Sequence, residues 1–331
     1  MKKVAILVPE TAIIEAVADP NYIFTAVNQF FQASGKSMLF EVKLVGTKKE
    51  IKLNGSLFTV HTHQLIEEKD QFDLVIIPAI SNNIATALNL NRELIPWLNE
   101  QYNGGAELAS LCIGAFLLAS TGLLNGKQCS THWNSANEFR VLFPEVELLD
   151  GCIITEDNGI YTSGGANSYW RLLLHLVEKY TDRETAILAS KFFAVDIDRE
   201  SQAAFALFKG QKDHQDEVIL KAQEFIEQNF ENKITVDDLA DKVSLGRRSL
   251  ERRFKLATNN SVMEYIQRVK IEAVKRRLET SGKNINEVMF GIGYTDTKNF
   301  RTIFKKITGL TPVAYRNKYH KIEENLKEVL A

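Results

Sequence analysis

Cysteine, proline and long apolar runs are all scarce in this 331-residue chain. Its three cysteines, Cys112, Cys129 and Cys152, are too few for the disulfide framework of a small secreted protein. No stretch approaches the roughly 20 uninterrupted apolar residues of a membrane span. The apolar run after Lys3 stops at Pro9, which is too short for the core of a secretory signal. We therefore expect a cytoplasmic protein without a membrane partner.

Net charge is also small, at −2, but the two halves of the chain carry opposite charge. Residues 217–331 hold 22 Lys and Arg against 16 Asp and Glu, a net charge of +6. Residues 1–216 hold 18 against 26, a net charge of −8. Because a single core seldom exceeds roughly 250–300 residues, the length predicts two domains. The basic half indicates nucleic acid as its partner.

The basic half contains one pattern twice: a short apolar-periodic helix, a polar break of three or four residues, and a basic helix. Thr235 stands three residues before Asp238, and Asn284 three before Glu287, which is the spacing of a helix-capping pair. Gly293 supplies the backbone freedom that a sharp turn between helices often needs. The repeated pattern predicts an all-α domain with two helix-turn-helix subdomains.

The basic helix of each copy has an apolar face and a polar face. Leu250 with Phe254, and Phe300 with Phe304, are four residues apart and predict the buried face. The opposite face carries side chains that can reach phosphates or base edges. We predict DNA contacts by Arg247, Arg248, Glu251, Arg252, Lys255, Thr297, Lys298, Arg301, Thr302 and Lys305. Amphipathic hairpins with solvated basic faces would explain a single copy as well, but the repetition favours DNA binding.

These motifs resemble the AraC/XylS family of bacterial transcription regulators over about a hundred residues. The landmarks are Asp-Leu-Ala at 238–240, Arg-x-Leu-x-Arg-x-Phe-Lys at 248–255, Gly-Tyr at 293–294, Phe-Arg-x-x-Phe-Lys at 300–305 and Gly-Leu-Thr-Pro-x-x-Tyr-Arg at 309–316. The resemblance implies that a linker helix at 262–278 joins the subdomains, whose recognition helices enter successive major grooves about 34 Å apart. It marks as base-reading residues Arg248, Arg252, Thr297, Lys298 and Thr302.

The first half alternates between short apolar strands and helical segments. Strands are predicted at 4–8, 40–45, 74–77 and 107–111, and helices at 22–33, 84–101 and 115–123. This alternation indicates an α/β domain with a mostly parallel, flavodoxin-like sheet and helices on both faces. Such sheets bind ligands at the carboxyl ends of their strands.

One predicted strand end carries a cysteine. Residues 109–115 run from a strand through Cys112 and Gly114 directly into a helix, with small residues beside the cysteine, as in a nucleophile elbow. The amino terminus of that helix would favour the thiolate form of Cys112. Taken alone, the cysteine is better explained as a small buried apolar residue.

Together with later motifs, this half resembles the ThiJ/PfpI superfamily, within the class-I glutamine-amidotransferase-like fold, over most of residues 3–195. The shared features are Glu15 after the first strand, Cys-x-Gly at 112–114, Thr-His-Trp at 131–133, Tyr-Thr-Ser-Gly-Gly at 161–165 and Leu-x-His-Leu at 173–176. The resemblance implies that Glu15, Cys112, Ile113 and His132 line one pocket, with the carboxyl group hydrogen-bonded to the thiol. Members include hydrolases, hydratases and glyoxalase-like enzymes, but no acid is evident that would orient His132 in a catalytic triad.

Other polar residues of this half carry weaker signals. His61 and His63 would share one face of a strand, but no third metal ligand is evident near them. Cys129 and Cys152 fit structural thiols, and His175 fits a core position in an apolar helix. We expect neither a metal nor a cofactor.

The predicted domains are a sensor and dimerisation domain at 1–204, a linker at 205–216, a DNA-binding domain at 217–320 and a tail at 321–331. We predict a sequence-specific regulator, not an enzyme, that binds promoter DNA as a homodimer, with RNA polymerase as a further partner. A small polar metabolite or an oxidant would act through the Glu15, Cys112 and His132 pocket by its different affinity for two arrangements of the protein. Two alternatives stay open: a cysteine-dependent hydrolase or hydratase fused to a DNA-binding module, and a dimerisation scaffold with an idle pocket. The sequence specifies neither the effector nor the operator.

Overall fold

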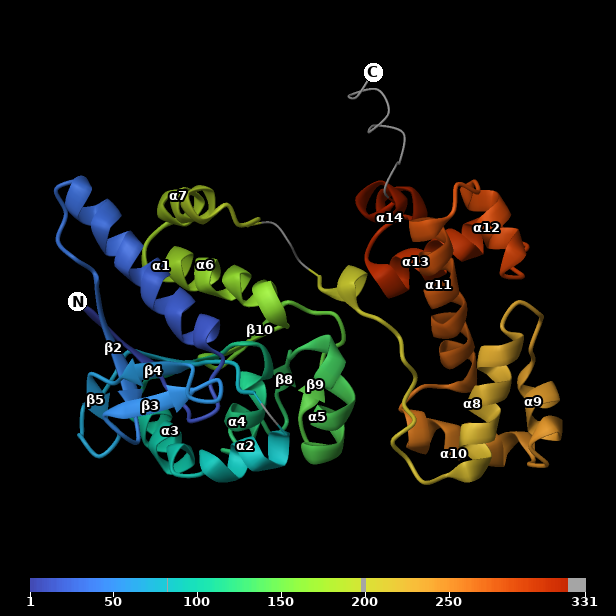
Figure 1. Ribbon diagram of the computed structural model, residues 1–331, viewed down its shortest axis with the longest axis horizontal. Helices are drawn as coiled ribbons and strands as arrows, with labels where there is room; N and C mark the ends of the chain where they lie inside the picture. Colours follow the sequence, from blue (N-terminus) through green and yellow to red (C-terminus); the bar gives the residue numbers. More distant parts are fainter. Residues whose placement is uncertain (82, 198–200, 321–331) are drawn as a thin grey trace, which may run out of the picture. The chain divides into compact units, whose positions relative to one another are not determined.

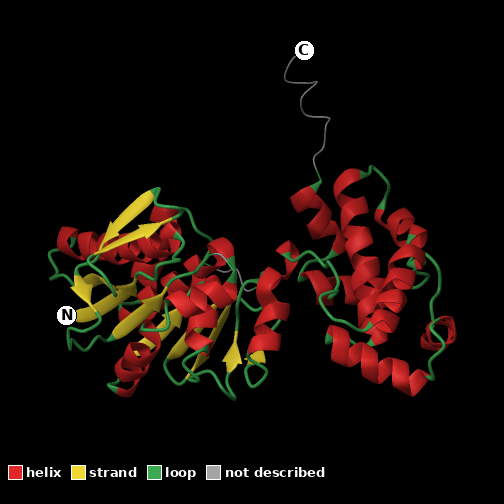
Figure 2. Ribbon diagram, turned by 60° about the horizontal axis from the view of Figure 1, so that its bottom comes forward, coloured by secondary structure: helices red, strands yellow, loops and turns green. Residues whose placement is uncertain are grey.

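The computed structural model describes residues 1–81, 83–197 and 201–320, so the predicted tail at 321–331 lies outside the described residues. The chain divides into two compact units, Met1–Gln202 and a unit from Ala203 onward. Within the described ranges, the first unit contains all the strands and the second is helical (Figure 2). No helix in these ranges is both long and apolar enough to cross a membrane.

The central sheet of the first unit has seven strands: β1 (Lys2–Leu7), β2 (Phe40–Gly46), β5 (Gln64–Leu65), β6 (Leu74–Ile77), β7 (Glu107–Ser110), β10 (Ile154–Asp157) and β11 (Ile160–Ser163). Their order is β10-β11-β7-β6-β1-β2-β5. All neighbours are parallel except β10 and β11, which form an antiparallel hairpin at one edge. Two small ribbons pair β3 (Glu50–Leu53) with β4 (Phe58–His61), and β8 (Gln128–Cys129) with β9 (Glu147–Leu148).

Helices cover both faces of this sheet (Figure 1). They are α1 (Ile14–Ala33), α2 (Ile84–Leu90), α3 (Leu94–Asn103), α4 (Ala115–Ala119), α5 (Ala136–Leu142), α6 (Tyr169–Tyr180) and α7 (Arg183–Phe193). Successive strand residues point to opposite faces, so Val4 and Ile6 join a core with α1, α6 and α7, whereas Ala5 and Leu7 join a core with α2 to α5. Strands buried on both faces read as continuous apolar runs, which is why their positions were predictable. The predicted fold class is confirmed.

Three predicted helices have different bounds in the structure. The helix predicted at 84–101 is two helices, because Asn91 turns inward and its side chain bonds Glu10 N, Thr11 Oγ1 and Ala87 O. The helix predicted to begin at residue 22 begins at 14 and continues through the buried Pro20. The helix predicted to end at 123 ends at 119, where the hydroxyl groups of Ser120 and Thr121 bond carbonyl oxygens of the last turn.

The second unit has seven α-helices among its described residues: α8 (Glu217–Asn229), α9 (Val236–Lys242), α10 (Arg247–Thr258), α11 (Val262–Thr280), α12 (Ile285–Gly291), α13 (Thr297–Thr308) and α14 (Pro312–Tyr319). They form two separate apolar cores. α8, α9, α10 and the start of α11 enclose one core, and the end of α11 encloses the other with α12, α13 and α14. The long helix α11 is therefore the element that both cores share (Figure 1).

Candidate nucleic-acid interface and cysteine pocket

Both predicted helix-turn-helix subdomains form, and their first helices begin with the predicted caps. Thr235 and Asp238 exchange side-chain-to-backbone hydrogen bonds of 3.1 Å at the start of α9. Asn284 and Glu287 do the same at 2.9 and 2.8 Å at the start of α12. These reciprocal bonds satisfy backbone N–H groups that a helix start would otherwise leave unpaired.

The turns of the two subdomains have the same backbone conformation. Gly293 has φ +78° and Ser244, at the corresponding place before α10, has φ +54°. A residue with a side chain is strained in this left-handed region by about 1 kcal/mol, which glycine avoids. Serine therefore gives a weaker turn signal in the sequence although it adopts the same turn.

The recognition helices α10 and α13 bury the predicted apolar faces and expose the predicted polar ones. Leu250, Phe254, Phe300 and Phe304 are each 0% exposed. Nine of the ten predicted DNA-contact side chains are exposed, and Thr297 at the start of α13 is half-buried. The structure thus leaves the polar faces of both helices open to a partner.

Several of these side chains already have partners within the protein. Arg247 lies 3.0 Å from Asp237 and 3.3 Å from Glu251, so its charge is partly neutralised. Lys255 donates to the carbonyl oxygen of Asn259 at 2.8 Å. Among the described residues, five of the predicted cationic side chains have no hydrogen-bond or ion-pair partner: Arg248, Arg252, Lys298, Arg301 and Lys305. These five cations are the ones available to phosphates and base edges without breaking an internal contact.

Arg253 is a basic residue of α10 with a different role. Its guanidinium group forms two hydrogen bonds to the carboxylate of Asp216, at 2.9 and 2.6 Å. This contact holds the pKa of Asp216 below its usual value. Asp216 also caps α8, so the pair ties the recognition helix to the first helix of its subdomain. No local pattern indicates this inward orientation beyond the position of Arg253 next to the buried Phe254.

Cys112 stands at a sharp turn between β7 and α4. Its φ is +56°, in the left-handed region where strained nucleophile elbows are found. A side chain at Gly114 would place Cβ 2.5 Å from the carbonyl oxygen of Pro78, so this position must be glycine. The backbone of Cys112 is fixed by Ser163 Oγ, which accepts from its N–H, and by Thr131 Oγ1, which donates to its carbonyl. The elbow geometry expected from the sequence is present.

Cys112 is 5% exposed, and burial raises the pKa of its thiol. The backbone N–H groups of Ala166 and Ile113 face the sulfur and act in the opposite direction, but burial prevails. The two N–H groups lower the pKa, as expected for a helix amino terminus, but the overall shift is upward, so the expectation of a favoured thiolate is wrong. Desolvation destabilises a buried thiolate by more than two N–H dipoles stabilise it.

His132 lies beside the elbow but is not bonded to the thiol. Its Nδ1 accepts the backbone N–H of Asn134 at 3.0 Å, which places the proton of the neutral ring on Nε2. A Cβ at Gly165 would lie 1.9 Å from the ring, so the imidazole packs directly on that glycine. Burial lowers the pKa of His132. No hydrogen bond joins His132 to Cys112 among the described residues, so the pair lacks the contact that would activate a nucleophile.

Glu15 lies in the first turn of α1 and is exposed. The charges of Glu15 and Cys112 both act on Tyr169, which brings the three groups into one neighbourhood. The hydroxyl group of Tyr169 donates to Asp19 at 2.6 Å, and burial, followed by this bond, raises the pKa of Tyr169. No hydrogen bond joins Glu15 to the thiol in the described part of the structure. Asp19 and Tyr169 were not predicted, although Asp19 is one helical turn after Glu15 and would share its face.

Gln202 is a third residue near the elbow that the sequence did not indicate. It is 2% exposed and bonds three separate loops, accepting from Gly165 N and donating to the carbonyl oxygens of Thr131 and Cys152. It thereby fixes the glycine on which His132 packs. Within the described ranges, no three His, Cys, Asp or Glu side chains cluster as metal ligands.

Comparison with known proteins identifies both units. Residues 3–179, more than half of the chain, match the model of the DJ-1/PfpI family. The chain belongs to the DJ-1/PfpI family. Residues 239–318 of this DJ-1/PfpI family member match the model of a helix-turn-helix domain. The predicted combination of a PfpI-like domain with an AraC-type helix-turn-helix domain is confirmed.

Named relatives of this DJ-1/PfpI family member are regulators. The HTH-type transcriptional regulator GbdR of Pseudomonas aeruginosa is 27% identical over 244 residues, which cover 70% of this chain and 64% of that protein. The HTH-type transcriptional regulator ArgR of the same species is 26% identical over 221 residues, covering 66% of this chain and 67% of that protein. The chain thus spans slightly less than two thirds of GbdR. A crystal structure from Vibrio parahaemolyticus shares the fold, with a TM-score of 0.52, 23% identity and coverage of 58% of this chain and 98% of that one.

Proposed function

We propose that this protein is a sequence-specific, DNA-binding transcriptional regulator whose DJ-1/PfpI unit senses a small molecule or redox signal at the pocket of Glu15, Cys112 and His132. One observation carries the DNA-binding part. Two helix-turn-helix subdomains share α11, and each presents a recognition helix with exposed, unpartnered cations. The names of the relatives support the same function.

The pocket supports sensing rather than catalysis. A thiol with a raised pKa is protonated near neutral pH, and the imidazole of His132 makes no bond that would remove its proton. Tyr169, Asp19 and Glu15 add polar groups at the elbow that a small polar effector could satisfy. Such an effector would regulate DNA binding through unequal affinity for two arrangements of the protein. Homodimerisation, RNA polymerase contact and a cytoplasmic location stay predictions.

The alternative function is a cysteine-dependent hydrolase or hydratase fused to a DNA-binding module. The left-handed conformation of Cys112 favours this alternative, because it projects the side chain from a sharp turn, as in enzymes with a nucleophile elbow. Turnover of aldehydes, amides or isonitriles by the purified protein, abolished in Cys112→Ala and kept in Cys129→Ala, would support it. Absence of turnover together with a regulatory response supports sensing.

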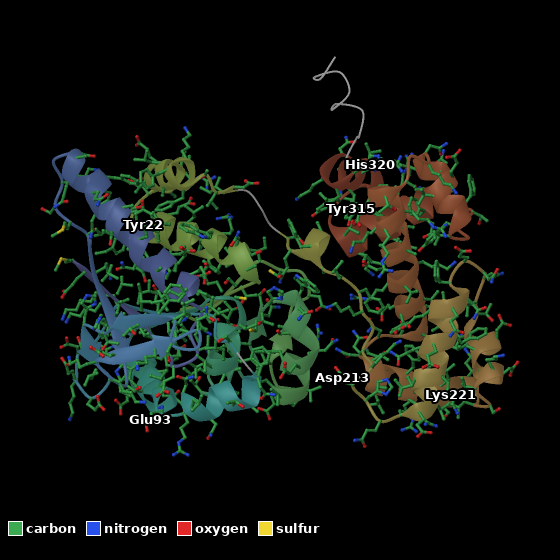
Figure 3. The ribbon with its side chains drawn as sticks, viewed as in Figure 1. Tyr22, Glu93, Asp213, Lys221, Tyr315 and His320 are labelled. Atoms are coloured by element: carbon green, nitrogen blue, oxygen red, sulfur yellow. The ribbon has the colours of Figure 1, made fainter. Side chains whose placement is uncertain are left out.

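Selection of bound duplexes from a random pool, followed by sequencing, tests the DNA-binding function in the full-length protein. We expect the protein to enrich a defined motif, and Arg248→Ala/Arg252→Ala to lose that enrichment. The matched control is Lys221→Ala/Lys283→Ala, which removes two exposed charges of the same unit outside the recognition helices (Lys221 is labelled in Figure 3). If wild-type protein enriches no motif, or if the control loses enrichment equally, the proposal fails.

A reporter gene placed under the enriched motif tests sensing. We expect Cys112→Ala to change the response to extracts or peroxide that alter reporter output, whereas Cys129→Ala, another buried thiol, keeps it. An unchanged response after replacement of Glu15, Cys112 and His132 together would favour the scaffold alternative instead.

A further inference from the structure

The two helix-turn-helix subdomains have separate cores, so the distance between their recognition helices depends on what joins them. The 19-residue helix α11 provides a rod about 28 Å long. A rod alone fixes separation along its axis but leaves each subdomain free to pivot where it packs on the helix. Contacts that cross from one subdomain to the other are therefore decisive for where α10 and α13 point.

Lys270, in the middle of α11, makes such a contact. Its side chain is buried, and its Nζ donates to the carbonyl oxygens of Ile292 at 2.9 Å and of Asn232 at 3.2 Å. Ile292 belongs to the turn before α13, in the second subdomain. Asn232 belongs to the loop between α8 and α9, in the first. One buried ammonium group thus joins backbone atoms of both subdomains to the helix between them.

Two further contacts join the same pair of backbone segments. Gly293 has φ +78°, and a Cβ there would lie 2.2 Å from the carbonyl oxygen of Glu231, so the two segments touch through their backbones. Arg277, two turns after Lys270 on α11, donates to Gly291 O at 2.9 Å and pairs with the carboxylate of Glu231. We name these contacts of Lys270, Arg277 and Gly293 the inter-subdomain bridge.

The bridge continues into the second recognition helix. Lys270 Nζ lies 5.5 Å from the ring centre of Tyr294, within range of a cation–π contact. The ring of Tyr294 packs on Phe300 of α13 with 5.3 Å between centroids. The position of the ammonium group therefore bears on the orientation of α13 as well as on the turn that precedes it.

We propose that Lys270, with Arg277 and Gly293, is a specificity-determining positioning residue that fixes the spacing at which the protein accepts two DNA half-sites. This inference rests on the proposed DNA-binding function. A buried cation bonded to two carbonyl oxygens has one geometry, and its loss leaves both acceptors unpaired at the contact between the subdomains. Without it, the subdomains can pivot on α11, and α10 and α13 can meet their half-sites at more than one separation.

The test is selection from random duplexes with full-length Lys270→Met, in which the side chain keeps its length but loses its donors. Wild type should enrich two motifs at one separation. Lys270→Met should enrich the same motifs at several separations, or the α13 motif should vanish. On a duplex with one base pair inserted between the motifs, wild type should lose about tenfold or more in affinity, and the variant less than about threefold.

Lys275→Met is the matched control. Lys275 is also a buried lysine of α11, but it bonds Ala206 O and Glu272 and does not contact the turn before α13. It should keep the single separation. If Lys270→Met does not fold, Arg277→Gln tests the bridge instead, by the same selection and the same inserted base pair. Arg277 is only partly buried, so this substitution disturbs the fold less.

A folded Lys270→Met or Arg277→Gln protein that keeps one separation and wild-type sensitivity to the insertion overturns the bridge while leaving the proposed function intact. A wild-type protein that enriches no motif overturns both. Equal broadening in Lys275→Met also overturns the inference, because any buried lysine of α11 would then suffice.

Discussion

The salt dependence of DNA binding follows from the number of free cations on the recognition helices. Five predicted cationic contacts are exposed and have no internal partner among the described residues: Arg248, Arg252, Lys298, Arg301 and Lys305. If each neutralises one phosphate charge, the slope of log affinity against log salt is about −4.5. Affinity should then fall about 500-fold between 50 and 200 mM monovalent salt.

Substitution of two of these arginines should change the slope by a defined amount. Arg248→Ala/Arg252→Ala leaves three free cations, so the slope becomes about −2.7 and the loss over the same range about 40-fold. Lys221→Ala/Lys283→Ala, with the same loss of charge elsewhere in the unit, should keep a slope of about −4.5. Both lysines are exposed outside the recognition helices.

Fluorescence anisotropy of the full-length protein with the selected duplex, at four or more salt concentrations, measures these slopes. Equal slopes for wild type and the arginine double variant would mean that α10 does not approach the phosphates, and the assignment of the interface would be wrong. If the slope of the lysine control falls by the same amount, binding depends on the total charge of the unit and not on the recognition helices.

Three further predictions concern single residues. Asp216→Asn should lower the free energy of unfolding by about 1 kcal/mol in urea titrations. Arg253 holds the pKa of Asp216 below its unfolded value. The difference in stability between wild type and variant should therefore be present above about pH 4 and disappear as the pH falls further. Ser244→Gly should raise the free energy of unfolding by about 1 kcal/mol by relieving the left-handed serine, with unchanged DNA affinity. Alkylation of Cys112 by iodoacetamide, followed by mass spectrometry, should be slower than that of a free thiol at pH 7 and increase above pH 9; equal rates at pH 6 and 8 would contradict a protonated thiol.

Local patterns predicted the second unit well because its determinants are local. Caps three residues apart, apolar pairs four apart and a glycine turn specify each helix-turn-helix from neighbouring residues alone. The ten predicted interface residues were found in the same way, because helical periodicity places them on the polar faces of α10 and α13. Helical periodicity left Arg253 out of the predicted DNA contacts, but it could not indicate the partner of Arg253, because Asp216 lies 37 residues earlier in the chain.

The elbow at Cys112 was predictable from the sequence, but the chemistry of its thiol was not. Small residues and glycine around Cys112 predicted the elbow, since the steric requirement lies within a few residues. The pKa of its thiol depends instead on burial by distant segments, which opposes the local helix dipole. The roles of Tyr169 and Gln202 arise from contacts across 150 and 71 residues, so no local pattern indicates them.

The linker predicted at residues 205–216 is bonded to helices of the second unit. Ala206 O accepts from Lys275 Nζ at 2.6 Å, and Phe208 N donates to Glu272 at 3.2 Å. The ring of Phe208 packs on Tyr265, 5.0 Å between centroids. The carbonyl oxygen of Gln211 accepts from Gln223 at 2.8 Å. Polar composition predicted a linker, but here the polar backbone serves as the partner of buried side chains.

These contacts predict where an independently stable DNA-binding fragment begins. In a fragment that starts at Glu217, the buried Lys275 and Glu272 keep each other at 2.8 Å but lose Ala206 O and Phe208 N as partners. The shorter fragment also lacks Gln211, which bonds Gln223, and Asp216, which caps α8 and pairs with Arg253. At about 1 kcal/mol for each lost hydrogen bond, its melting temperature should be more than about 10 °C below that of a fragment that starts at Ala203. Phe208→Ala in the longer fragment should account for part of the difference. Equal melting temperatures of the two fragments would show that residues 203–216 are a passive linker. A change in the first unit could then not affect α11 through the contacts of these residues.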